Sequence, residues 1–158
     1  MPRSTRWLVV LLRVAMGWML LYAGITKVLD PAWTAAGYLR NAHTFSAFYQ
    51  WFAQPGNIEW VNALNAWGLT LIGIALFVGL GVRVAAPLGA ALMLLYYFPV
   101  LQFPHPNAHS YLVDEHIVYA LALLVLAAMG AGRMMGLDAW CARLPLCRRY
   151  PRLRSIFG

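Results

Sequence analysis

The chain has 158 residues, of which 62% are hydrophobic and 11% are charged, and its formal net charge is +7. Soluble domains carry about 25% charged residues, so this composition excludes an ordinary soluble domain and predicts an integral membrane protein. The positive charge does not indicate a nucleic-acid partner, because most of the arginines lie just outside apolar stretches, where arginines orient membrane helices.

The first apolar stretch, Trp7–Leu29, is long enough to cross a hydrocarbon layer about 30 Å thick and too long for the apolar part of a cleaved signal peptide. Arg13, Gly17, Gly24 and Lys27 recur on it at helical spacing and share one face. The two glycines predict close packing against another helix. For Arg13 two interpretations stay open: its side chain extends to the headgroups, or it contacts an interior partner or substrate.

The connection that follows, residues 31–58, is rich in aromatic side chains. Phe45, Phe48, Tyr49 and Phe52 lie at i, i+3, i+4 and i+7, which predicts a short amphipathic helix. Aromatic side chains of this kind gather at headgroup depth, so we expect the helix to lie in the membrane interface. It would act either as a surface anchor or as a lid over a lateral entrance for a lipid-soluble substrate.

Three further apolar stretches predict spans over about 59–80, 84–103 and 112–131. Together with the first span (7–29) they predict an all-α, antiparallel four-helix membrane bundle formed by residues 1–136. The tail, residues 137–158, mixes apolar residues with arginines, which predicts a basic amphipathic segment on the cytoplasmic membrane surface. Cys141 and Cys147 fall in this tail, and we expect them to be ordinary thiols in a reducing compartment.

The distribution of charge predicts the orientation. Among the basic residues only Lys27 and Arg40 fall on the side opposite to the termini, and Arg13 lies within the first span. Because basic residues are retained on the cytoplasmic side, both termini are expected in the cytoplasm, with the chain embedded in a prokaryotic cell (inner) membrane.

Polar residues within the spans gather at the outer end, which predicts a pocket there because ionisable groups at membrane depth are costly. Glu115 or His116 would accept protons, and Lys27 would attract a small anion; these are the candidate catalytic residues. Tyr119, one helical turn deeper than His116, would donate a hydrogen bond to a quinone carbonyl. The candidate quinone-binding residues are Tyr119, Tyr97, Asn65 and Arg13. The alternative is a set of interfacial ion pairs that closes the end of the bundle.

A metal centre is not expected. His105, His109 and His116 offer ligands on the outer side, but Pro106 prevents a regular helical pair of the first two. A buried haem is also not expected, because no histidine lies in the middle of a span.

Three segments, Arg13–Trp33, Gly79–Gly89 and Asp114–Asp138, resemble the DoxX/DoxD family. The resemblance is closest to the DoxD branch, the membrane subunit of thiosulfate:quinone oxidoreductase, and extends over roughly residues 10–140. It implies a four-helix membrane protein that passes electrons to a diffusible quinone, in the best case while oxidising thiosulfate to tetrathionate. It also implies a second oxidoreductase subunit or a respiratory oxidase as partner.

Whether the chain is itself catalytic stays open at this point, because a family resemblance alone does not assign an activity. The alternative function is that of a non-catalytic accessory or assembly subunit of a respiratory or redox-stress membrane complex. The expected surroundings are membrane lipid and quinone, with no nucleic acid, and a homo-oligomer is compatible with the sequence.

The predicted topology can be tested by labelling of introduced cysteines. A cysteine near Asn41 should react with a membrane-impermeant maleimide in intact cells, because the connection between the first two spans is expected outside. A cysteine at Ser155 should react only after the membrane is opened. Labelling of position 155 in intact cells would place the tail outside and contradict the orientation.

Overall fold

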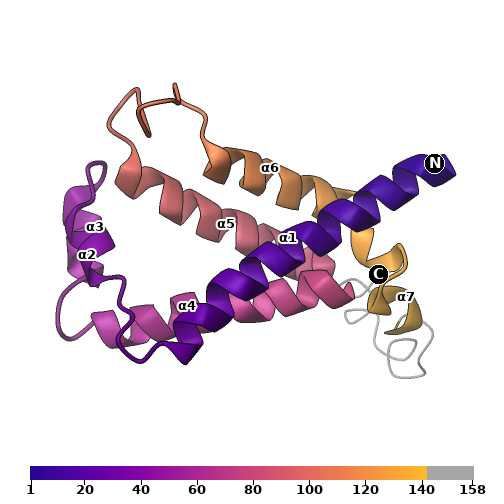
Figure 1. Cartoon of the computed structure of the whole chain (residues 1–158), viewed down its shortest axis with the longest axis horizontal. Helices are drawn as coiled ribbons and strands as arrows, with labels where there is room; N and C mark the ends of the chain where they lie inside the picture. Colours follow the sequence, from indigo (N-terminus) through magenta and orange to yellow (C-terminus); the bar gives the residue numbers. More distant parts are fainter. Residues whose placement is uncertain (142–158) are drawn as a thin grey trace.

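Long apolar helices account for most of the protein (Figure 1). The computed structural model describes residues 1–141. The helices in this part are α1 (Arg3–Leu29), α2 (Ala36–Arg40), α3 (Ser46–Phe52), α4 (Ile58–Val78), α5 (Val82–Val100), α6 (Glu115–Ala128), the 3-10 turn η1 (Ala131–Arg133) and α7 (Leu137–Cys141). The predicted surface tail therefore lies outside the described residues beyond α7.

Three helices, α1, α4 and α5, are long and apolar enough to cross a membrane. They correspond to the first three predicted spans. The fourth predicted span is shorter than expected, because α6 has 14 residues and a length of about 21 Å at 1.5 Å per residue. It starts where the Asp114 side chain accepts hydrogen bonds from the first turn, and it ends before Gly130, which has a φ of 59°. A four-span bundle therefore stays a prediction for the α6 segment.

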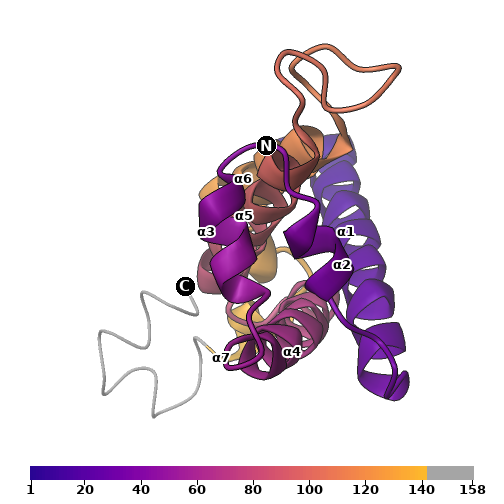
Figure 2. The ribbon, with the colours of Figure 1, turned by 90° about the vertical axis from the view of Figure 1, so that its left-hand side faces the viewer.

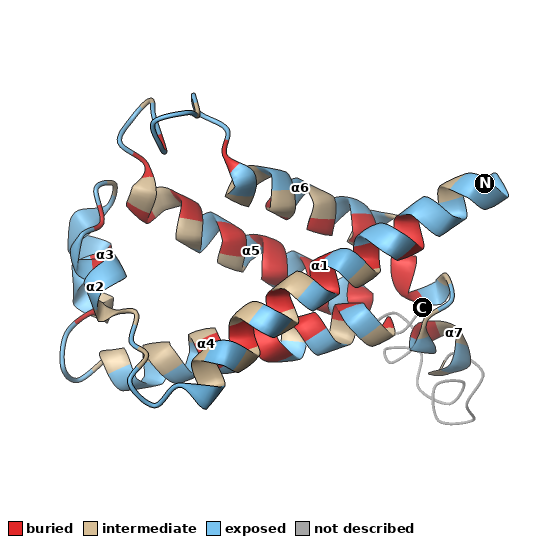
Figure 3. Ribbon diagram, viewed as in Figure 1, coloured by how far each residue is buried: buried red, intermediate tan, exposed pale blue. Residues whose placement is uncertain are grey.

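The long helices pack in pairs, α1 along α4 and α5 along α6, and α4 also contacts α5 (Figures 1 and 2). Their inward faces form one apolar core, which includes the fully buried Leu76, Leu123 and Leu126 (Figure 3). The outward faces carry large exposed apolar side chains such as Leu71 and Leu121. Such surfaces suit contact with lipid, and together with the three long helices they indicate a multi-pass membrane protein.

Glycines allow α1 and α4 to approach each other closely. A Cβ atom on Gly24 would lie 2.4 Å from the backbone nitrogen of Thr70, and one on Gly73 would lie 2.3 Å from that of Leu21. Gly17 meets the backbone at Phe77 in the same way. The prediction that Gly17 and Gly24 face another helix is confirmed, and the partner is α4.

Two short helices, α2 and α3, lie at one end of the long helices (Figure 1). They form a second apolar cluster in which Tyr49 of α3 packs with Leu39 of α2. The predicted amphipathic helix is thus present as α3, but its aromatic stripe is divided. Tyr49 is buried, whereas Phe45 and Phe48 are exposed. The position of α3 in a membrane interface stays a prediction.

The close contact between α1 and α4 can be tested with two alanine substitutions in α4. Gly73→Ala should lower the melting temperature of the purified protein in detergent, because overpacking of this kind costs about 1–3 kcal/mol. Gly68→Ala is the matched control: no atom lies within 4 Å of its added Cβ, and alanine favours a helix over glycine. Equal melting temperatures for the two variants would show that the helices do not pack at Gly73.

Candidate functional site

Lys27 is the centre of a polar network that joins the three long helices. Its ammonium group donates hydrogen bonds of 3.0 Å to the Asn65 Oδ1 atom of α4 and of 3.0 Å to the Tyr96 hydroxyl of α5. The Tyr96 hydroxyl in turn donates to Asn65 Oδ1 over 2.8 Å. Nζ also lies 4.8 Å from the centre of the Trp33 ring, a distance at which a cation is attracted to an aromatic face. The charge is therefore held within the protein.

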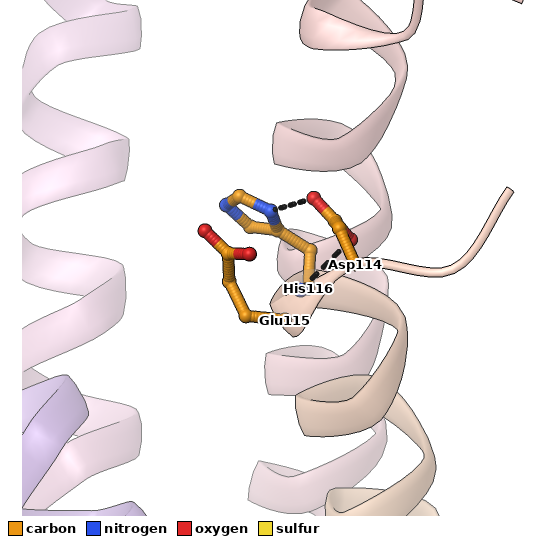
Figure 4. Close-up of side chains that lie close together, drawn as sticks. All are labelled: Asp114, Glu115 and His116. Atoms are coloured by element: carbon orange, nitrogen blue, oxygen red, sulfur yellow. Dashed lines mark hydrogen bonds and ion pairs between the residues drawn. The ribbon is translucent and has the colours of Figure 1, made fainter. Parts of the chain in front are cut away.

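A second polar unit stands at the start of α6 (Figure 4). The Asp114 carboxylate accepts hydrogen bonds from the backbone nitrogens of His116 and Ile117, over 3.0 Å and 3.3 Å. Its other oxygen lies 2.7 Å from His116 Nδ1. This carboxylate thus begins the helix and orients the imidazole, because an N-cap acceptor satisfies the unpaired donors of a first turn.

The two polar units meet at Tyr96. The Tyr96 ring lies 6.0 Å from the His116 ring, measured between centroids. Lys27 and His116, two of the predicted catalytic residues, are therefore linked through a tyrosine of α5. Glu115 is exposed at the first position of α6, beside His116. No hydrogen bond or ion pair joins Glu115 to Lys27 among the described residues.

Asp114, Glu115 and His116 also form a group of potential metal ligands, with donor atoms within 4.8 Å of one another. Both oxygens of Asp114 already accept hydrogen bonds within the helix start, and Glu115 is exposed. His105 is not part of this group; its Nδ1 atom lies 3.3 Å from the Ser110 carbonyl oxygen in the loop before α6. These contacts explain the arrangement without a metal, and we assign none.

An apolar pocket of about 150 Å³ adjoins the Lys27 network. It lies between α2 and α3 on one side and α4 and α5 on the other. Aromatic and aliphatic side chains form its walls, and Asn65, Tyr96 and Tyr38 supply the polar groups. The lining residues are Ala35, Tyr38, Leu39, Tyr49, Phe52, Trp60, Val61, Leu64, Asn65, Leu92, Leu95 and Tyr96.

Two tyrosines of the short helices line this pocket and donate hydrogen bonds to the backbone of α5. The Tyr38 hydroxyl donates to the Tyr96 carbonyl oxygen, and the Tyr49 hydroxyl donates to that of Leu95 over 3.2 Å. Burial raises the pKa of both Tyr38 and Tyr49, so both hydroxyls keep the proton that they donate. The Asn65 Nδ2 atom, in contrast, has no hydrogen-bond partner among the described residues. It is available to a ligand.

A second hollow, of about 500 Å³, lies beyond Tyr38 and is bordered by Asn41, His43 and Gln102. Tyr38 borders both hollows. The lining of the second hollow is the more polar of the two.

The structure places the other candidate residues outside the apolar pocket. Tyr97 is buried, and its hydroxyl donates to the Leu112 carbonyl oxygen, which ties α5 to the loop before α6. Tyr119 packs against the core of the long helices and does not line the pocket. The sequence prediction omitted Tyr96 and Tyr38 from the site. The choice between Tyr96 and Tyr97 depends on the rotation of α5 about its axis, which a uniformly apolar helix does not reveal.

Arg13 lies toward the opposite end of α1, about 21 Å along the helix from Lys27. It is 2% exposed, and its guanidinium donates to the carbonyl oxygens of Ala131, Met134 and Met135 over 2.6, 2.9 and 3.4 Å. It therefore contacts the backbone of the chain after α6 and takes no part in the Lys27 network. Its Nε atom is buried without a hydrogen-bond partner in the described part of the chain.

These features define a multi-pass helical membrane protein with a polar network beside a lateral apolar pocket. A family model, DoxX, matches residues 8–102, which is more than half of the chain. The chain belongs to the DoxX family, and this membership indicates a membrane protein of the redox- or quinone-associated type. The match includes Lys27, Asn65 and Tyr96 and ends before α6. The chain matches no curated protein and no solved structure.

The role of Arg13 can be tested by its removal. Arg13→Gln should lower the melting temperature of the purified protein, because hydrogen bonds to a charged group are worth about 1.5–3 kcal/mol each and the freed Ala131 carbonyl is buried. It should also make the chain near Met134 and Met135 sensitive to protease. Arg3→Gln, an exposed change on the same helix, is the control and should behave like the wild type. An unchanged melting temperature for Arg13→Gln would contradict a structural role for the arginine.

Proposed function

We propose that this protein is the membrane subunit of a quinone-linked oxidoreductase and that the apolar pocket binds the quinone ring. The proposal rests on the position of the Asn65 amide group. It lines an apolar pocket, its oxygen is held by Lys27 and Tyr96, and its nitrogen is left to donate to a ligand. Ligand sites of this kind are mostly apolar, with a few polar groups that fix the orientation.

The size and surroundings of the pocket suit a quinone. An apolar cavity of about 150 Å³ accommodates a benzene ring, and the pocket has this volume. Trp60, Leu64 and Leu95 line it and are at the same time exposed on the apolar surface of the helices. A ring carrying a long apolar tail can therefore enter from the lipid and leave its tail outside.

A quinone accepts two electrons and two protons and becomes a quinol. In the proposed site the Asn65 amide donates a hydrogen bond to a ring carbonyl and holds the ring in place. Lys27 fixes Asn65 and Tyr96 in the required positions, since it donates to both. His116, oriented by Asp114 and in ring contact with Tyr96, takes up protons at the polar end and passes them toward the pocket.

The electron donor that we propose is a small sulfur anion, thiosulfate. Two thiosulfate anions each lose one electron and join through a new S–S bond to give tetrathionate, and the two electrons reduce one quinone. The hollow bordered by Asn41, His43 and Gln102 is open to hydrophilic solutes and is separated from the quinone pocket by Tyr38. A partner chain bound at this end would bring the anion to the site.

The quinone site can be tested by binding alone. A short-chain quinone should quench the tryptophan fluorescence of the purified protein, because Trp60 lines the pocket. Asn65→Leu should weaken this binding about tenfold or more, which corresponds to the loss of one hydrogen bond of about 1.4 kcal/mol. Tyr96→Phe should weaken it less, because its hydroxyl acts through Asn65. Tyr22→Phe, on the exposed face of α1, is the control and should bind like the wild type.

If a folded Asn65→Leu variant bound quinone with unchanged affinity, the proposed quinone site would be refuted. The donor is tested separately, with protein purified from native membranes together with whatever copurifies. Thiosulfate should then reduce added quinone. If the protein binds quinone but this reaction does not occur, the quinone site stands and thiosulfate is excluded as the donor. If the protein neither binds quinone nor supports the reaction, an accessory or assembly subunit without catalysis is favoured.

A further inference from the structure

Three arginines from separate elements border one hollow at the end of the protein that carries Arg13. Arg6 belongs to α1, Arg83 to the first turn of α5 and Arg133 to η1. The hollow has a volume of about 410 Å³, and Met1, Met129 and Met134 complete its lining. We call it the arginine hollow. It is separate from the pocket beside Lys27, with which it shares no lining residue.

The positive charge of the arginine hollow is not balanced within the described part of the chain. None of the three arginines makes a side-chain hydrogen bond or an ion pair there, and no carboxylate lines the hollow. Of the five acidic residues in the sequence only Asp138 lies at this end. Its oxygens accept hydrogen bonds from the backbone nitrogens of Gly81 and Val82, over 2.7 and 3.3 Å, and it is 3% exposed. The sequence after residue 141 contains no aspartate or glutamate.

The surface around the arginine hollow is apolar. Trp7 follows Arg6, Val84 follows Arg83, and Val125 lies one turn before the end of α6; all three are exposed. Trp and Arg side chains occur together at the level of lipid headgroups. Basic pockets between membrane helices are known to receive the phosphates of anionic lipids.

We propose that the arginine hollow binds a phosphate-bearing anion, and that its source is the headgroup of an anionic phospholipid. Guanidinium groups pair with phosphate oxygens through charged hydrogen bonds, so arginines that border one hollow are suited to hold a phosphate there. The methionines of the hollow and the exposed Trp7, Val84 and Val125 then contact the lipid tails. The lipid would join the start of α1, the start of α5 and the turn after α6. This inference does not depend on the quinone site.

A structural role for the same arginines has to be distinguished in the test. They lie near the C-terminal end of α6, and positive charge stabilises the partial negative charge at a helix C-terminus. That effect needs no ligand. Only a bound anion makes the stability of the protein depend on the lipid headgroup.

The test uses the full chain, purified in a neutral detergent. Phosphatidylglycerol added to the micelles should raise the melting temperature more than phosphatidylcholine, and native mass spectrometry should find phosphatidylglycerol retained. Arg83→Gln combined with Arg133→Gln should reduce this retention about tenfold or more, since each basic residue near anionic lipid contributes about 1 kcal/mol. The matched control, Arg3→Gln with Arg40→Gln, removes the same charge outside the hollow and should retain the lipid.

Two further arms complete the test. Arg83→Lys with Arg133→Lys keeps the charge and the fold and should retain part of the preference, because lysine lacks the paired hydrogen bonds. Inorganic phosphate at constant ionic strength identifies the source: stabilisation by phosphate and not by the lipid would assign the hollow to a soluble phosphate compound. The proposal would be overturned if the wild type retained both lipids equally and phosphate had no effect. It would also be overturned if the two glutamine variants lost phosphatidylglycerol to the same extent.

Discussion

Two positive charges on one face of a membrane helix constrain the whole structure. Arg13 and Lys27 both belong to α1, and each must find partners inside the protein because a charge in hydrocarbon is costly. Arg13 finds them in the carbonyl groups after α6, and Lys27 in Asn65 and Tyr96. The two sets of partners fix α1 at two points, against the turn η1 at Arg13 and against α4 and α5 at Lys27. Gly17 and Gly24, on the same face, let the backbone of α4 approach closely between these points.

The sequence was sufficient to predict the features that depend on composition and helical spacing. Uniformly apolar stretches predicted α1, α4 and α5, and the spacing of Gly17 and Gly24 predicted a helix contact that the structure confirms. The length of α6 was predicted too long, because apolar residues continue beyond the positions where the Asp114 side chain and Gly130 set its ends. Hydropathy does not record these local hydrogen bonds and dihedral angles.

The site was predictable only in part, for a related reason. Lys27 and Asn65 stand out as polar residues in apolar helices, and the structure brings them together. Tyr96 lines the pocket in place of Tyr97 and Tyr119, because the rotation of α5 directs it to Lys27. Tyr38 comes from α2, a five-residue helix without a sequence signal of its own. Side chains on short connecting segments depend on tertiary contacts, here with the α5 backbone at Tyr96.

The polar groups around Arg13 and those around Lys27 differ in their partners. Around Arg13, three carbonyl groups accept hydrogen bonds from the guanidinium, and two backbone nitrogens donate hydrogen bonds to the Asp138 carboxylate. The packing at Gly132 is close, since an added Cβ atom there would lie 1.9 Å from an oxygen of the Asp138 carboxylate. These hydrogen bonds join α1 to the turn after α6 and α7 to the start of α5. At the other end the Asn65 amide keeps a free donor beside an open apolar pocket. The Asn65 Nδ2 atom can donate to water or to a ligand in this pocket, whereas the Arg13 Nε atom is buried without a hydrogen-bond partner in the described part of the chain.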